Sequence, residues 1–301
     1  MQPVTTDDIV DPIPTAQEPV SLQETPKEST LEELPTEVIS VSQVSPVSPT
    51  ILAPSLPDFA QGEARLFLDI CSGATRPLSA AILAQQGNVL SFDILLDKRM
   101  DLLNDQSYEQ LLRICSSGQV AYGAASPSCA HYSRLKLHRP GPKALRTPEA
   151  LDGVPGLNSM ELLQVQESFM MLFRTITCLT LIFQAGGHAH LEQPPSAMSW
   201  LEECVKSFLV LISAWCTVIS ACEYGRNWYK QWMFASSWQQ ISTLGCLCSH
   251  PYGSHTSLVG TRSESGEFLS RQTACYPPAL AEAFANLVSP LVNQHSKDFK
   301  W

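Results

Sequence analysis

The sequence predicts an α/β fold: a doubly wound, mostly parallel sheet with an antiparallel hairpin at one edge. Two observations predict it. From about residue 63, short apolar runs alternate with helical segments, a pattern typical of parallel β–α–β units. The first run, Leu66–Ile70, leads into Cys71-Ser72-Gly73, which predicts a tight turn at the carboxyl end of a buried strand. Doubly wound sheets bind ligands at that edge.

The other elements follow the same alternation. Strands are predicted where short apolar runs are bounded by turn residues, and helices where a longer amphipathic pattern begins at proline or ends before glycine. The predicted strands are 66–70, 88–92, 120–125, 188–191, 217–221 and 231–235, the last two forming the edge hairpin. The predicted helices are 77–85, 108–115, 159–184, 200–215 and 279–288, and a long loop spans about 136–156.

Residues 1–62 form a tail of different composition. The first 60 residues hold ten acidic residues and one basic residue, Lys27, so they carry −9 of the net charge of −10. Pro, Ser, Thr and Glu dominate, and no aromatic residue precedes Phe59. Such a segment buries too little apolar area to offset its ordering entropy. We therefore expect a disordered acidic tail over 1–62 and one nearly neutral domain over 63–295.

The cysteines and the N-terminus bear on the compartment. Ten cysteines at irregular spacing, in a chain that does not begin with a basic stretch and an apolar core, indicate free thiols in a reducing environment. We therefore expect an intracellular protein, in the nucleus or cytoplasm and not secreted. Two apolar stretches are unsuited to crossing a membrane, because Arg174 interrupts 169–183 and 207–222 is too short. Both are predicted to be buried core.

Polar residues at the first two strand ends predict a pocket for a nucleoside cofactor. Asp69, Ser72 and Gly73 close the first strand, and Asp93 closes the second. A carboxylate at the end of the second strand is well placed to bind two ribose hydroxyls. Asp101, a few residues later, can accept from an adenine amino group. The alternative for Asp69 is that it caps the helix that follows.

The next two strands end in a second pair of reactive residues. Cys129 follows the strand 120–125 in a proline-bearing loop, and Glu192 follows the strand 188–191. A cysteine that faces a carboxylate describes a nucleophile with a partner that handles protons. The alternatives are a buried, inert cysteine and a buried structural acid.

Four segments resemble motifs of the cytosine-C5 DNA methyltransferase family. Residues 68–73 (LDICSG) resemble its Asp-Leu-Phe-x-Gly motif, and 126–133 (SPSCAHYS) resemble its Pro-Pro-Cys-Gln-x-Phe-Ser loop. Residues 191–194 (LEQP) resemble its Glu-Asn-Val motif. Tyr276-Pro277-Pro278 and the helix 279–288 stand where the family has its closing helix. The order is that of the family, and the resemblance covers about residues 64–292.

The resemblance implies a Rossmann-like methyltransferase domain that uses S-adenosylmethionine and acts on DNA. Cys129 would attack C6 of cytosine, and Glu192 would hold the N3 edge of the base. C5 would then accept the methyl group and lose its proton. The target base would first leave the duplex, because C6 is unreachable in the base stack.

Departures from the family pattern leave two other functions open. Ala74-Thr75-Arg76 stand where the family has further glycines, the catalytic loop reads Pro-Ser-Cys, and no Arg-x-Arg motif is found. The changed motifs favour a catalytically inactive nucleic-acid-binding or scaffold protein that keeps the fold. The other alternative is a methyltransferase with a different substrate.

A basic run after Cys129 is a candidate for phosphate contacts, with a solvated loop as the alternative. It consists of Arg134, Lys136, Arg139, Lys143 and Arg146.

A late Cys/His cluster is a candidate zinc site. Cys246, Cys248, His250 and His255 fall within ten residues and are of the types that zinc prefers. Their spacing is not a common structural zinc pattern, so the alternative is a Pro-Gly turn whose histidines are hydrogen-bonded or face the target. The cysteines predicted to be core residues are Cys71, Cys178, Cys204, Cys216 and Cys222.

Overall fold

The computed structural model describes two long stretches of the chain, residues 65–137 and 142–251. It also describes 253–256, 258, 261–262, 266, 269, 273, 275–292, 298–299 and 301. All of these residues belong to one compact unit. The acidic tail predicted over 1–62 lies outside the described residues.

The centre of the fold is a mixed sheet, which confirms the predicted mostly parallel sheet with an antiparallel edge. Within the described residues it has seven strands in the order β5-β6-β4-β3-β1-β2-β7. The strands from β7 to β4 run parallel, whereas β6 is antiparallel to both β4 and β5. The strands are β1 (Leu66–Ile70), β2 (Val89–Phe92), β3 (Val120–Ala125), β4 (His188–Gln193), β5 (Trp215–Ser220), β6 (Gln231–Ser236) and β7 (Asp298–Phe299).

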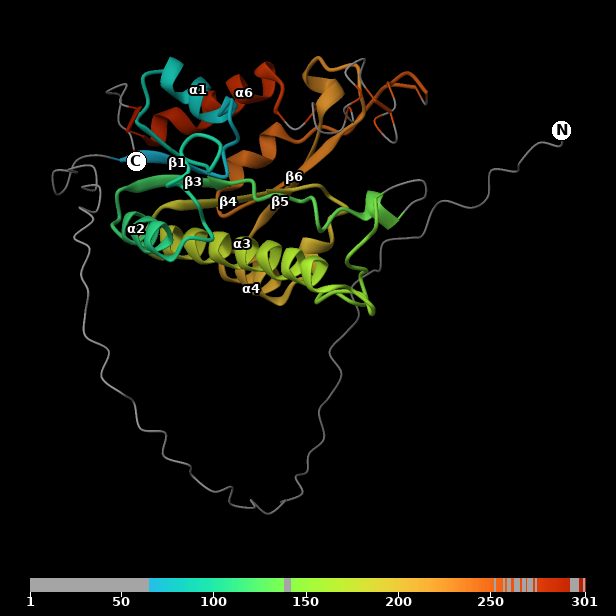
Figure 1. Ribbon diagram of the computed structural model, residues 1–301. Helices are drawn as coiled ribbons and strands as arrows, with labels where there is room; N and C mark the ends of the chain where they lie inside the picture. Colours follow the sequence, from blue (N-terminus) through green and yellow to red (C-terminus); the bar gives the residue numbers. More distant parts are fainter. Residues whose placement is uncertain are drawn as a thin grey trace, which may run out of the picture. The chain divides into compact units, whose positions relative to one another are not determined.

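Helices cover both faces of the sheet (Figure 1). Helices α1 and α6 pack together on one face, and α2, α3 and α4 lie on the other. The helices are α1 (Pro77–Ala84), α2 (Asp105–Cys115), α3 (Ser159–Gln184), α4 (Glu203–Leu211) and α6 (Pro278–Val288). The 3₁₀ turns are η1 (Arg134–Leu137), η2 (Met198–Leu201), η3 (Ala221–Tyr224), η4 (Gln239–Leu244) and η5 (Ser289–Leu291).

The central strands are buried on both faces, as their apolar sequences predict. Every residue of β1, β2 and β3 is buried. Two apolar clusters form, one under α2, α3 and α4 and the other under α1 and α6. Gly123 lets α3 approach β3 closely, because a Cβ there would collide with the Ile182 side chain. The packing of α3 therefore depends on a residue without a side chain.

Helix α3 is clearly delimited by its sequence. Asn158 caps its first turn and forms a capping box with Glu161.

By length and composition alone, α3 is the one helix within the described residues that could cross a membrane. In the fold it packs against β3 and β4. Arg174, in the middle of α3, forms an ion pair of 2.5 Å with Asp105 of α2.

The bounds of several predicted elements differ from the structure. The predicted helix 200–215 ends at Leu211, because Ser213 adopts a left-handed conformation (φ 49°) and Trp215 begins β5. The predicted strand 188–191 extends to Gln193, because β6 pairs with its last residues. Glu192 therefore lies within a strand and not in the loop after it. The sheet also includes β7, which lies beyond residue 295, the predicted end of the domain.

Candidate functional site

The sheet order reverses between β1 and β3. The chain passes from β1 to β2 on one side, then returns to β3 on the other side of β1 and continues to β4. The loops that leave β1 and β3 therefore diverge at their carboxyl ends, where open parallel sheets bind ligands. Because β1 to β4 are parallel, all the predicted strand-end residues lie along this one edge.

The loop from β1 to α1 is conformationally strained. Three of the residues from 71 to 76 have left-handed backbones: Cys71 (φ 57°), Gly73 (φ 72°) and Arg76 (φ 44°). For the two that are not glycine, such conformations cost roughly 1–3 kcal/mol each and cluster at functional sites. A Cβ at Gly73 would meet no atom within 4 Å, so the backbone there borders open space. A ligand can therefore approach this loop closely.

The structure brings some of the predicted cofactor residues together and keeps others apart. The Gly73 N–H donates to Oδ2 of Asp93 at 2.8 Å, and the Leu95 N–H donates to Oδ1 of the same carboxylate at 2.8 Å. Asp101 accepts from the N–H of Leu103 at 2.8 Å, and Ser72 donates to the neighbouring Gly73 carbonyl at 3.4 Å. Gly73 and Asp93 thus form a unit, whereas the bonds of Asp101 and Ser72 are local.

Asp69, near the end of β1, forms a hydrogen bond with the first turn of α1. It is 3 % exposed, and its Oδ2 accepts from Oγ of Ser79 at 2.6 Å. Burial raises the pKa of Asp69 to about 7, against the lowering effect of the side-chain and backbone hydrogen bonds of Ser79. Ser79 lies in the first turn of α1, whose N-cap residue Arg76 forms no side-chain cap. This geometry matches the alternative that Asp69 caps the helix.

Cys129 lies half-buried in the loop after β3. Gln193 holds this loop by donating from Nε2 to the Pro127 carbonyl at 2.5 Å. Burial raises the pKa of Cys129, and the negative charge of Glu192 raises it further. The positive charge of Lys230 acts in the opposite direction. In this arrangement the thiol is protonated at neutral pH, and its ionisation depends on the charge of Glu192.

Glu192 is almost wholly buried and titrates near neutrality. Burial raises its pKa to about 7, while Lys230 and hydrogen bonds from Tyr276 and Ser126 lower it. The Tyr276 hydroxyl donates to Oε2 of Glu192 at 3.2 Å and lies 2.8 Å from Oγ of Ser126. Near pH 7 the carboxyl group can therefore either donate or accept a proton. The charge of Glu192 acts on Cys129, so the two side chains lie near each other.

Lys230 and Ser126 belong to this site but were not predicted to take part in it. The ammonium of Lys230 donates to the Thr273 carbonyl at 2.7 Å and lies 5.4 Å from the centre of the Trp232 ring. Its pKa is lowered by burial and raised by the negative charges of Glu192 and Cys129. The sequence signal is weak: one lysine just before an apolar strand. Only the pairing of β6 with β4 brings it to Glu192.

The basic run does not form one patch. The guanidinium of Arg146 is buried and donates to the carbonyls of Leu151 and Val165 and to Oγ of Ser168. Lys143 pairs with Glu161 at 2.7 Å. Sequence reasoning was wrong to group these two with Arg134 and Lys136, which lie on η1 next to the Cys129 loop. Arg139 lies outside the described residues.

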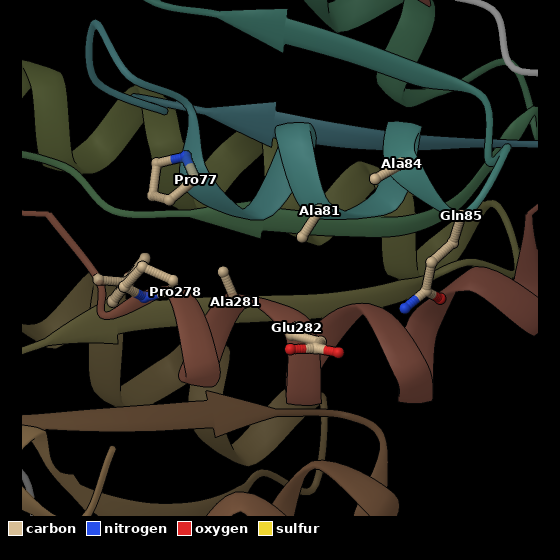
Figure 2. Close-up of a pocket in the computed structure, with 8 residues that line it drawn as sticks. Pro77, Ala81, Ala84, Gln85, Pro278, Ala281 and Glu282 are labelled. Carbon is tan, nitrogen blue, oxygen red and sulfur yellow. The ribbon is translucent and has the colours of Figure 1, made fainter. Parts of the chain in front are cut away.

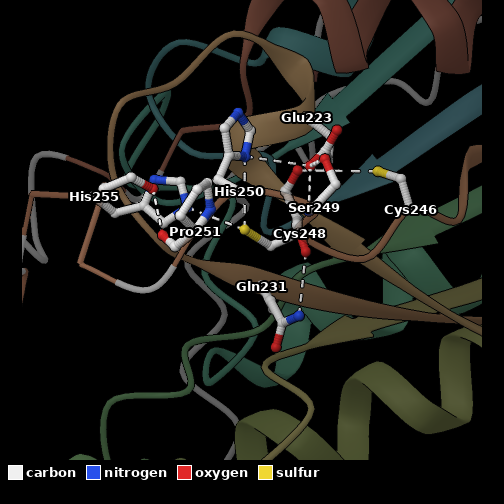
Figure 3. A network of polar contacts seen from close by, with 10 residues as sticks. Glu223, Gln231, Cys246, Cys248, Ser249, His250, Pro251 and His255 are labelled. Atoms are coloured by element: carbon white, nitrogen blue, oxygen red, sulfur yellow. Dashed lines mark hydrogen bonds and ion pairs between the residues drawn. The ribbon is translucent and has the colours of Figure 1, made fainter.

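The late Cys/His cluster has a different membership from the predicted one. Its ligand atoms come from Cys222, Cys248, His250 and His255, and they all lie within 4.8 Å of one another. Figure 3 shows three of these residues, Cys248, His250 and His255. Cys222 was predicted to be a core residue. Cys246 is not part of the group, because its backbone pairs with Val218 and Ser220 on β5.

An open groove of about 460 Å³ lies between α1 and α6 (Figure 2). Small apolar side chains such as Ala81 and Ala281 form most of its wall, with Gln85 and Glu282 at the margin. It contains none of the predicted catalytic or cofactor residues. We therefore place the candidate site at the carboxyl edge of the sheet, where the reactive groups converge.

Neither a scan against protein-family models nor a search of curated proteins gives a match for this chain.

Proposed function

We propose that this chain is a methyltransferase that transfers the methyl group of S-adenosylmethionine to C5 of cytosine in DNA. One observation carries the proposal. Cys129, in the loop after β3, and Glu192, on the neighbouring parallel strand β4, lie close enough that the charge of the carboxylate raises the pKa of the thiol. They share the carboxyl edge of the sheet with the strained loop at Gly73.

The fold supports the proposal at a coarser level. The order β2-β1-β3-β4, which reverses between β1 and β3, is compatible with a doubly wound sheet. The antiparallel β5–β6 pair agrees with the edge hairpin expected of a Rossmann-like methyltransferase domain.

The cofactor fits the loop between β1 and α1. Open space borders Gly73, and the Asp93 carboxylate at the end of β2 provides acceptors for ribose hydroxyls. Bound S-adenosylmethionine would supply an electrophilic methyl group on a sulfonium. The residues of the chain would hold the cofactor's ribose and expose the methyl group to the crevice.

Cys129 and Glu192 would act on the base as a coupled pair. The Cys129 thiolate would form a bond to C6, which makes C5 nucleophilic toward the methyl group. Loss of the C5 proton to a base and cleavage of the bond between C6 and sulfur would then release the product. A protonated Glu192 would donate to N3 of the base. Because a neutral Glu192 no longer repels the thiolate, and because Lys230 attracts it, this protonation state also favours ionised Cys129.

The test is transfer of a labelled methyl group from S-adenosylmethionine to cytosine-containing DNA, with RNA of the same sequence in parallel. We expect transfer to DNA, a covalent complex with fluorocytosine DNA, and loss of both in Cys129→Ser. Serine is a far weaker nucleophile near neutral pH. Cys216→Ser, at an exposed position of β5, is the matched control and keeps full activity. Transfer by Cys129→Ser would contradict the mechanism.

A second candidate function is an inactive scaffold that keeps the fold, and two observations favour it. The Asp93 carboxylate already accepts two backbone N–H groups, and burial keeps Cys129 protonated. Isothermal titration with S-adenosylmethionine distinguishes the two functions. Binding that is weakened in Asp93→Ala supports the enzyme, whereas no binding to the wild-type chain supports the scaffold.

A further inference from the structure

Four cysteine and histidine side chains, none of them part of the catalytic pair, converge on one point. Cys222 comes from η3, directly after β5, and the other three come from the segment that follows η4. Sγ of Cys248 lies 3.0 Å from Nε2 of His255 and 3.6 Å from Nδ1 of His250. Figure 3 shows the side chains of His250 and His255 pointing toward Cys248. All four ligand atoms lie within 4.8 Å of one another.

These separations fit a tetrahedral zinc ion. Zinc binds thiolate sulfur at about 2.3 Å and imidazole nitrogen at about 2.0–2.1 Å, so the ligand atoms of a regular tetrahedron lie about 3.3–3.8 Å apart. Two sulfurs and two nitrogens also match the borderline softness of zinc. Two thiolates would balance the charge of the ion.

We propose that Cys222, Cys248, His250 and His255 bind one zinc ion with a structural role. Four protein ligands close the coordination shell, which is typical of structural and not catalytic zinc. The proposal is independent of the methyltransferase function, because none of the four residues belongs to the catalytic site.

The surroundings of the cluster hold its ligands in place. Oε1 of Glu223, next to Cys222, accepts from the backbone N–H of Ser249 at 2.8 Å and from its hydroxyl at 2.9 Å. The ring of Tyr229 stacks on His255 with the centroids 5.9 Å apart. Such outer contacts orient metal ligands.

The ion would join two segments that hydrogen bonds already connect. The N–H of Thr256 donates to the Asn227 carbonyl at 2.9 Å, and a bridge pairs Trp228 with Thr256. The segment from 227 to 230 then leads into β6 and carries Lys230. Zinc would therefore fix the connection between β5 and β6 that delivers Lys230 to Glu192.

The test measures metal content in the full chain, purified after expression with added zinc. We expect one zinc per wild-type chain by elemental analysis and the same in Cys246→Ala. Cys222→Ala and His255→Ala lose most of the zinc. Cys246 is the matched control, because it lies two residues before Cys248 and outside the cluster. Wild-type protein without zinc, or zinc retained in Cys222→Ala but lost in Cys246→Ala, would overturn the proposal.

A second measurement does not depend on the folding of a variant. Wild-type protein reconstituted with Co²⁺ is expected to show the intense d–d bands of a tetrahedral site and a thiolate-to-cobalt charge-transfer band. Removing the metal with a chelator is expected to lower the melting temperature, and added Zn²⁺ to restore it. Weak octahedral bands would contradict the site.

Discussion

The hydroxyl of Tyr276 lies 3.2 Å from Oε2 of Glu192, although 84 residues separate the two in the chain. Tyr276 lies two residues before the start of α6 at Pro278, and Glu192 lies near the end of β4. The same hydroxyl reaches Ser126 at the end of β3 at 2.8 Å. One tyrosine therefore connects α6 with the ends of the two strands that deliver the reactive residues.

This contact predicts the effect of Tyr276→Phe. The hydrogen bond from Tyr276 lowers the pKa of Glu192, so its loss should raise that pKa above about 7. The measurement is a carbon-13 NMR titration of glutamate carboxyl groups. Tyr224→Phe is the control, because the Tyr224 hydroxyl donates to the Leu244 carbonyl instead. An unchanged midpoint in Tyr276→Phe would show that the bond does not form in solution.

The raised pKa of Glu192 makes stability depend on pH. The pKa of Glu192 is about 7 in the folded protein, against an ordinary value of 4.5. The contribution of Glu192 to stability is thus fully present below pH 4.5 and is lost as the pH rises through 7. Glu192→Gln lacks this loss, so its stability relative to wild type should rise by about 3 kcal/mol between pH 4 and pH 8. Urea denaturation at both pH values measures the difference, and a constant difference would be contrary to the prediction.

The thiol of Cys129 should respond to both charged neighbours. Because Glu192 raises the pKa of Cys129 and Lys230 lowers it, Glu192→Gln should speed alkylation of Cys129 at neutral pH, and Lys230→Met should slow it. Each unit of pKa changes the thiolate fraction roughly tenfold. Mass spectrometry of the Cys129 peptide after timed iodoacetamide treatment measures the rate. Equal rates in the three proteins would place the charges too far from the thiol.

Arg146 should act on stability. Its buried guanidinium donates to Leu151, Val165 and Ser168 and lies 4.1 Å from the centre of the Tyr132 ring. Arg146→Met removes these three hydrogen bonds from a buried site and should cost about 2–4 kcal/mol of unfolding free energy.

The matched control for Arg146→Met is Arg134→Met, on exposed η1. This change should alter stability by less than about 0.5 kcal/mol. A DNA-binding assay is the second measurement, and we expect weaker binding in Arg134→Met. Equal stability of the two variants would contradict the structural role of Arg146.

The close approach of α3 to β3 gives a packing prediction. In Gly123→Ala the new methyl group collides with Cδ1 of Ile182, which should cost about 1–3 kcal/mol. Ile182→Val removes that atom, so the double variant should recover part of the loss. Chemical denaturation measures all three proteins, and additive losses would show that the two sites do not touch.

The sequence by itself determined the order and type of most elements. The apolar runs of β1 and β3 and the capped pattern of α3 are local signals, because burial and capping depend on nearby residues. The same signals place Cys129 and Glu192 at neighbouring strand ends of one edge. The end of the helix before β5 was predicted too late, since the left-handed turn at Ser213 leaves no mark in the hydrophobic pattern.

Only the tertiary structure decided which side chains meet. Cys222 replaces Cys246 in the late Cys/His cluster, and Lys230 joins Glu192, because β6 pairs with both β4 and β5. The roles of Asp69 and Arg146 likewise follow from burial beside distant partners. Contacts between residues far apart in the chain depend on strand pairing and packing, which the local pattern of a sequence does not encode.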